Sequence, residues 1–83
     1  MHVYVVGNIY GREPIYTSNI VGVFDHINKA AWTVWETLNR MYSEGMIEDN
    51  APSIVDIIKS NGANYKRVGK FEGRLEITKY EVL

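Results

Sequence analysis

The chain contains no cysteine, only two prolines and almost no net charge. Its 83 residues include nine basic and ten acidic side chains, which leave a formal charge of −1 at pH 7. Without cysteine there is no disulfide framework and no thiolate chemistry, as is usual in a reducing cytosol. The balanced charge gives no global field that would attract nucleic-acid phosphates or an acidic membrane.

Long apolar runs and targeting signals are also missing. No stretch approaches the ~18 apolar residues of a membrane span, and the N-terminus lacks the basic region of a signal peptide. We therefore expect a cytoplasmic protein. The length is below that of an average domain, while hydrophobic residues make up 46% of the chain, enough for one core. Residues 1–83 are expected to form a single domain.

The N-terminal part of the chain predicts a β-hairpin. Residues 2–10 carry apolar side chains on both alternating faces, which is typical of a central strand. Turn residues follow at 11–14, and an extended pattern resumes at Ile15 and runs to Phe24 with an irregularity near Ser18 and Asn19. Gly22, inside this second strand, indicates a bulge or the close approach of another element.

Two helices are predicted next. Asp25 is a suitable N-cap for a helix that begins at His26 and runs to about Ser43, with Gly45 closing it. The apolar stripe of this helix consists of Ile27, Ala31, Val34, Leu38, Met41 and Tyr42. A second helix of about two turns is expected at 52–60. Pro52 would lie in its first turn, and Ser53 and Asp56 have the spacing of a capping box.

The C-terminal residues predict a second hairpin. Residues 64–71 and 74–82 flank Glu72 and Gly73, a dipeptide suited to a tight turn. The apolar alternation changes phase after Ile77, so we expect either a bulge near Thr78 and Lys79 or a polar end to the last strand. The fold class is α+β in the order ββα(α)ββ, with helices over one face of an antiparallel or mixed four-stranded sheet.

Residues 20–30 (IVGVFDHINKA) resemble a pattern found in many small phage and prophage proteins of unknown function. In those proteins an apolar residue, glycine, valine and an aromatic residue precede a capping Asp or Ser, and Lys-Ala follows in the helix. The resemblance covers about a dozen residues closely and implies a phage origin, hence a host cytoplasm as the location. It supplies no activity and no functional residues, and the segment 46–62 departs from the shorter members.

The sequence shows no recognisable motif for catalysis or metal binding. His2, His26 and Asp25 could meet at the starts of neighbouring elements, but they lack the spacing of a metal site. The serines lie in turn or capping contexts with no nucleophile elbow around them. We therefore expect no catalytic residue, no metal and no cofactor. A small enzyme or ligand-binding domain would need a concave polar pocket, which these residues do not indicate.

The tryptophans give the strongest functional indication. Trp32 falls on the polar side of the long helix, away from its apolar stripe, and Trp35 falls at the edge of that stripe. The predicted partner-binding residues are Trp32, Trp35, Asn28, Asn39 and Ser43. Two other interpretations stay open: the 52–60 helix covers Trp32, or Trp32 is buried in a symmetric dimer.

A second candidate surface is the C-terminal hairpin, which interleaves cations with aromatic rings. The candidate nucleic-acid-binding residues are Tyr65, Lys66, Arg67, Lys70, Phe71 and Arg74, with Lys79 as an extension. The alternative is a solubilising sheet face with edge protection.

The leading hypothesis is a non-enzymatic phage-type protein that binds and inhibits a host protein, such as a defence or transcription component. A nucleic-acid-binding module is the alternative.

Overall fold

In the computed structural model, which describes residues 1–12, 14–69 and 71–83, two helices pack on a four-stranded sheet. The elements in chain order are β1 (His2–Arg12), β2 (Ile15–Phe24), α1 (Ile27–Ser43), α2 (Ile54–Ser60), β3 (Gly62–Lys66) and β4 (Glu72–Glu81). The strand order is β2-β1-β4-β3, and every pair is antiparallel. The predicted α+β class and element order are confirmed.

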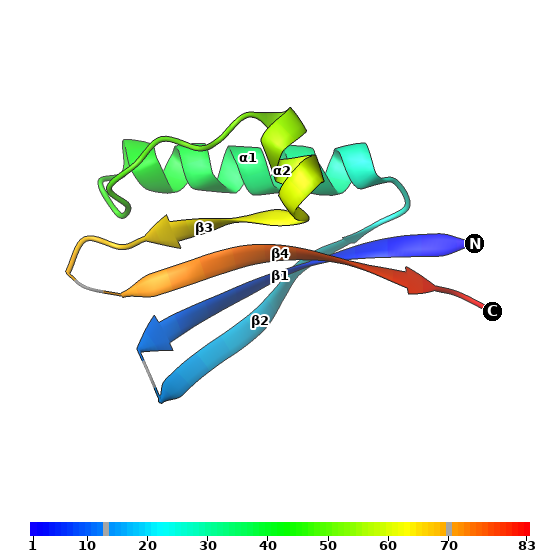
Figure 1. Ribbon diagram of the computed structural model, residues 1–83, viewed down its shortest axis with the longest axis horizontal. Helices are drawn as coiled ribbons and strands as arrows, with labels where there is room; N and C mark the ends of the chain where they lie inside the picture. The colour runs from blue at the N-terminus through cyan, green and yellow to red at the C-terminus, as the bar shows by residue number, and fades with distance from the viewer. Residues whose placement is uncertain (13, 70) are drawn as a thin grey trace.

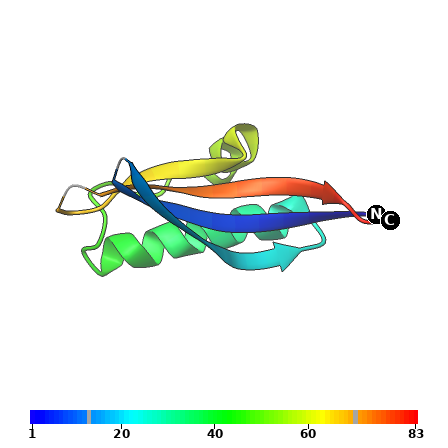
Figure 2. The same ribbon diagram turned by 90° about the horizontal axis from the view of Figure 1, so that it is seen from below.

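Both helices lie on the same side of the sheet (Figure 1). Figure 2, seen from the side opposite the helices, shows the strands in front of them. Val6 of β1 and Ile77 of β4 are opposite each other in the sheet, and both are buried against the helices. The neighbouring residue Val5 points to the open face, because successive side chains of a strand alternate. The buried core consists of Val6, Ala30, Ala31, Val34, Leu38, Met41, Ile47, Ile57, Ala63, Tyr65, Leu75 and Ile77.

The start of α1 differs from the prediction by one residue. The N-cap is His26, whose Nδ1 accepts a hydrogen bond from the backbone N–H of Asn28 at 3.2 Å. Asp25, predicted as the cap, instead accepts from the Lys29 ammonium group at 2.8 Å, one helical turn further on. The helix therefore begins at Ile27, because the chain is still extended at His26.

The end of α1 follows the prediction. Gly45 has a positive φ of 74° and donates its backbone N–H to the carbonyl of Tyr42 at 3.0 Å. Met46 donates to the carbonyl of Met41 at 2.8 Å. These two bonds form a Schellman motif, which satisfies carbonyls that have no partner within the helix.

α2 is shorter at its start than predicted. Ser53 is the N-cap, and its side chain accepts from the backbone N–H of Asp56 at 3.2 Å. Pro52 therefore lies just before the cap rather than in the first turn. The helix ends at Ser60, and its C-cap, Asn61, adopts a left-handed conformation with φ of 54° and is followed directly by β3.

The prediction of a tight turn at Glu72 and Gly73 is wrong. Both residues lie inside β4, and the β3–β4 connection is closed by a bond of 2.7 Å from the Arg67 N–H to the carbonyl of Phe71. Gly73 pairs with Tyr65 in the sheet, and a Cβ added to Gly73 would lie 2.2 Å from Cζ of the tyrosine ring. The glycine therefore makes room for the ring of Tyr65 and does not form a turn.

The sheet has one shift of register between β1 and β2 and none between β1 and β4 in the described pairs. β2 runs unbroken past Ser18 and Asn19, and the shift in register lies further on, where Val21 is an extra residue beside Gly22. The predicted bulge at Gly22 is confirmed to within one residue. In β4 the pairing with β1 continues to Glu81 without a shift, so the polar end of the strand explains the change of phase after Ile77.

Candidate protein-binding site

One side of α1 carries all three aromatic residues of the helix. On a helical projection these residues fall within roughly 100° of each other, together with three small polar residues. We call this surface the aromatic flank; it consists of Asn28, Trp32, Trp35, Asn39, Tyr42 and Ser43. It extends for roughly 22 Å along the helix axis, since each helical residue adds about 1.5 Å. The five residues predicted as a partner-binding set thus share one side of one element.

Trp32 is the exposed centre of the aromatic flank. Its exposed fraction is 48%, so neither α2 nor any other described element covers it. Its ring meets the ring of Trp35 edge to face, with centroids 5.2 Å apart and an interplanar angle of 81°. Trp35 is partly buried and packs against the core. Trp35 therefore holds Trp32 in place from below, and Trp32 presents a rigid apolar surface to solvent.

The polar residues of the aromatic flank differ in what they can offer to a partner. Asn28 is exposed at the start of the helix, and Asn39 is half-buried beside Trp35. The hydroxyl of Ser43 donates to the carbonyl of Asn39 at 2.9 Å, which leaves its lone pairs as acceptors. These groups lie around the tryptophans in the arrangement of a polar rim around an apolar centre.

Charge at the N-terminal end of the helix is paired within the chain. The hydrogen bond and the positive charge of Lys29 lower the pKa of Asp25 below its ordinary value. Both side chains are exposed, so the pair contributes little to stability. The charges of Asp25 and Lys29 therefore offset each other at this end of the helix, while the exposed carboxylate of Glu36 lies one helical turn after Trp32.

The C-terminal hairpin is arranged differently from the predicted nucleic-acid-binding surface. Tyr65 is only 8% exposed and points to the helices, where its hydroxyl donates to the side-chain oxygen of Asn8 at 2.5 Å. Burial raises the pKa of Tyr65, partly offset by the hydrogen bond to Asn8. The ring of Tyr65 is therefore part of the core and is not available to stack on a base.

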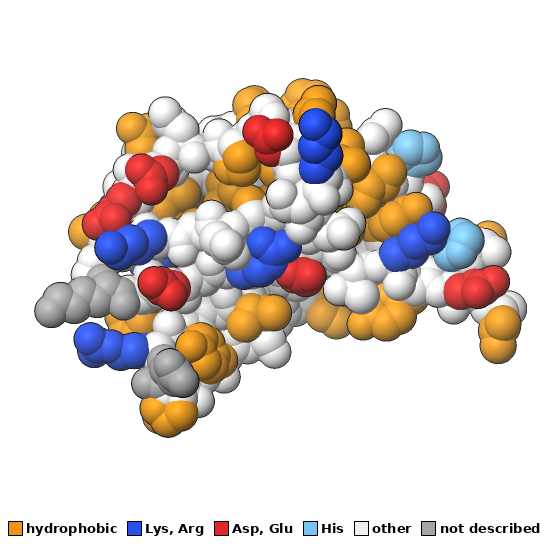
Figure 3. Space-filling model, in the orientation of Figure 1, with side chains coloured by type: hydrophobic (Ala, Val, Ile, Leu, Met, Phe, Trp, Pro, Cys, Tyr) orange, Lys and Arg blue, Asp and Glu red, His pale blue; other side chains and the backbone are white. Residues whose placement is uncertain are grey.

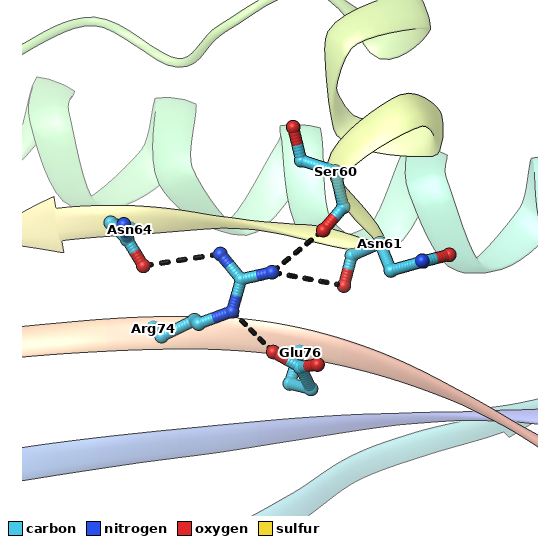
Figure 4. Close-up of polar contacts among 5 residues, drawn as sticks. All are labelled: Ser60, Asn61, Asn64, Arg74 and Glu76. Atoms are coloured by element: carbon cyan, nitrogen blue, oxygen red, sulfur yellow. Dashed lines mark hydrogen bonds and ion pairs between the residues drawn. The ribbon is translucent and has the colours of Figure 1, made fainter.

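Arg74 links three elements of the fold (Figure 4). From β4 its guanidinium group donates to the carbonyl of Ser60 at 2.7 Å, at the end of α2, and to the side chain of Asn64 in β3 at 3.1 Å. The same group is ion-paired with Glu76. A cation that satisfies carbonyls at a helix C-terminus stabilises that end of the helix. Arg74 is thus engaged within the chain.

The other predicted nucleic-acid-binding residues do not form one positively charged surface in the part of the chain that the structure describes. Lys66 pairs with Glu48 at 3.9 Å, Arg67 is partly buried, and Phe71 is exposed. Lys70 lies outside the described residues. Figure 3 shows basic and acidic side chains interleaved across this side of the molecule. Such mixing weakens the attraction for a phosphate backbone.

A groove of about 500 Å³ beside β3 was not predicted from the sequence. Its lining comes from β3, β4, the hairpin end of β1 and β2, and the segment that precedes α2. The charged residues that line it are Asp49, Lys66, Glu72 and Arg74. Both cations already have acidic partners, Glu48 for Lys66 and Glu76 for Arg74. The groove therefore carries both positive and negative side chains, and its cations are already ion-paired within the chain.

The described residues contain neither a cluster suited to a metal ion nor a helix suited to a membrane. No group of three or more His, Cys, Asp or Glu side chains lies close enough together to hold a metal ion within residues 1–12, 14–69 and 71–83. Neither described helix has the length and the apolar character needed to cross a lipid bilayer.

Tyr42 is a candidate binding residue that the sequence pattern assigned to the core. It was placed in the apolar stripe, yet its exposed fraction is 43%. Its position at the edge of the apolar stripe, next to Trp35 on the helical projection, could have identified it as a binding residue. Exposed aliphatic residues of β2 were also missed, because an edge position is not visible in a single strand pattern.

Comparison of the chain with protein-family models, with curated proteins and with solved structures gave no match.

Proposed function

We propose that the chain is a non-enzymatic protein that binds another protein through the aromatic flank of α1. The observation that carries this proposal is the half-exposed indole of Trp32, which rests on Trp35 and which no described element covers. In a chain this small, a solvent-exposed tryptophan leaves apolar area unused in the fold. Tryptophan and tyrosine contribute a large share of binding energy where they are buried in interfaces.

The surface that fits the aromatic flank is an apolar pocket or shelf with hydrogen-bonding groups around it. Trp32 would enter the apolar part, while Asn28 and Asn39 would pair with polar groups at its margin. The ring of Trp32 is already held against Trp35, so little of its side-chain entropy is lost on binding. The partner we propose is a host protein that is inhibited, because residues 20–30 resemble phage proteins.

A photo-crosslinking amino acid at position 32 tests the proposal in a lysate of the cells in which the protein is made. The expected result is a crosslinked protein that is absent when the same group is placed at Val55, an exposed residue of α2. With the captured partner purified, Trp32→Ala should weaken binding by about 30-fold, which corresponds to a hot-spot loss of roughly 2 kcal/mol. Val55→Ala should leave the affinity unchanged.

Two results would contradict the proposal. One is a crosslinking pattern at position 32 that matches the pattern at position 55 or contains no protein. The other is an equal affinity of the Trp32→Ala and Val55→Ala variants for the captured protein. Circular dichroism of both variants establishes that the fold is retained.

A further inference from the structure

β2 is an edge strand, and no described strand pairs with the backbone groups along its outer side. Val82 donates to the carbonyl of Met1 at 2.8 Å, which fixes the phase of the β1–β4 ladder. Because hydrogen-bonded pairs alternate along antiparallel strands, the even-numbered residues of β1 point their backbone groups to β2. In β2 the pairing then directs the backbone of Thr17 and Asn19 inward. The backbone N–H and C=O groups of Tyr16, Ser18 and Ile20 point outward.

This edge lacks the features that protect most edge strands. Residues 15–24 (IYTSNIVGVF) contain no charged residue and no proline. The extra residue, Val21, lies towards the far end, so the stretch before it is regular. The β3 edge is different: it is short, and Glu48 donates to the carbonyl of Lys66 at 3.1 Å, which covers one end of it.

The helices leave room for another strand beside β2. Every residue from Ile15 to Val21 is exposed, including Tyr16 at 57% and Ile20 at 70%. Figure 1 shows this end of β2 far from the helical layer, on the other side of β1 from β4. An added strand would therefore extend the sheet without meeting α1 or α2.

The edge is complementary to itself. If two copies of β2 pair antiparallel about a two-fold axis at Ser18, residues whose numbers sum to 36 are opposite each other. Tyr16 of each copy then faces Ile20 of the other on the open face, and Thr17 faces Asn19 on the helix face. Aromatic and β-branched residues form favourable cross-strand pairs, and an uncharged strand meets no repulsion from its own copy. All three outward-pointing residues use their hydrogen bonds in this register.

We propose that two copies of the chain associate through β2, with Ser18 on the two-fold axis, to form one continuous sheet with four strands from each copy. Both helical layers lie on the same face of that sheet, because opposed residues in an antiparallel pair point to the same side. The contact is isologous, so it closes at two copies. Trp32 takes no part in it, and the aromatic flanks of both copies stay free for a partner.

A single cysteine tests the register, since the natural chain has none. Opposed residues of a hydrogen-bonded pair have Cα atoms about 5.5 Å apart, within the range of a disulfide. Ser18→Cys should therefore form a disulfide-linked dimer under mild oxidation, whereas Val55→Cys should not. Equal and slow crosslinking of both variants would overturn the proposal.

A proline at the same position tests the edge itself. The N–H of Ser18 points outward, so Ser18→Pro removes a bond of the dimer without removing one of the β1–β2 ladder. In sedimentation equilibrium over a wide concentration range, the natural chain and Val55→Lys should dimerise. Ser18→Pro should remain monomeric, and Ile20→Lys should weaken association by at least about tenfold. A monomeric natural chain at every concentration, or dimerisation of Ser18→Pro, would refute the β2 contact.

Self-association through β2 does not depend on the proposed binding of a partner protein. Trp32→Ala should dimerise as the natural chain does. A dimer that is lost in Trp32→Ala but kept in Ser18→Pro would assign self-association to the aromatic flank instead and overturn the β2 proposal.

Discussion

Replacing Gly73 by alanine should destabilise the fold, although the same change in an ordinary strand position stabilises it. Glycine in a strand costs roughly 0.5–1 kcal/mol relative to alanine, because it loses more backbone freedom on folding. At Gly73, however, the new Cβ would lie 2.2 Å from Cζ and 2.4 Å from the hydroxyl oxygen of Tyr65. The ring must move, and its movement breaks the 2.5 Å hydrogen bond to Asn8.

The magnitude follows from the two interactions that are lost. A hydrogen bond of this kind contributes about 1 kcal/mol net. If a third of a ring of roughly 200 Å² becomes exposed, the loss of burial adds about 1.5 kcal/mol. Subtracting the gain from removing a glycine leaves a net destabilisation of about 2 kcal/mol, and a melting temperature lower by about 8–16 °C for a domain of this size.

The assay is urea denaturation followed by circular dichroism, with Gly7→Ala as the matched control. Gly7 lies in the central strand β1, and a Cβ there would make only an ordinary contact of 3.7 Å with the carbonyl oxygen of Asn19. That variant should be more stable than the natural chain by about 0.5 kcal/mol. In a Tyr65→Val background, Gly73→Ala should lose most of its cost. A Gly73→Ala variant as stable as the natural chain would refute the packing of Tyr65 over Gly73.

Two further predictions concern a helix cap and alkaline pH. Ser53→Ala should lower the free energy of unfolding by about 1 kcal/mol, because it removes the acceptor for the N–H of Asp56, while Ser60→Ala should change it little; equal losses in thermal melts of the two variants would contradict the cap. The pKa of Tyr65 is raised by burial from an ordinary value of 10.0, so the unfolded chain loses this proton first and the contribution of Tyr65 falls as pH rises above about 10. Denaturation of the natural chain and of Tyr65→Phe across this pH range should show their stability difference shrinking only above pH 10, and a constant difference would refute the assignment.

The sequence pattern predicts the elements of this fold better than their ends. The two hairpins and two helices follow from apolar spacing and caps, which are local. The turn at Glu72 and Gly73 was misplaced because the local sequence does not show why a glycine is present. Gly73 makes room for the ring of Tyr65, but its neighbours in the sequence look like those of a glycine in a turn. The cap of α1 was misplaced by one residue, since Asp25 and His26 can both accept from a helix N-terminus and Lys29 engages Asp25.

The candidate site was predictable in part for the same reason. Helical spacing places Trp32 opposite the apolar stripe, and this needs no tertiary information. Whether α2 covers Trp32 depends on how α2 packs against α1, which the spacing does not contain. Tyr65 and Arg74 were assigned to a binding hairpin because their partners, Asn8 and the end of α2, lie far away in the sequence or across strands. The open edge of β2 likewise depends on strand order.

The central claim is that Trp32 is a fixed, solvent-exposed binding residue. The most direct measurement is tryptophan fluorescence of Trp35→Phe, in which Trp32 is the one remaining indole because the chain has two tryptophans. We predict red-shifted emission that acrylamide quenches efficiently in the isolated chain, and a blue shift with protection from acrylamide when the captured partner is added. Blue-shifted emission with weak quenching in the isolated chain would contradict the claim.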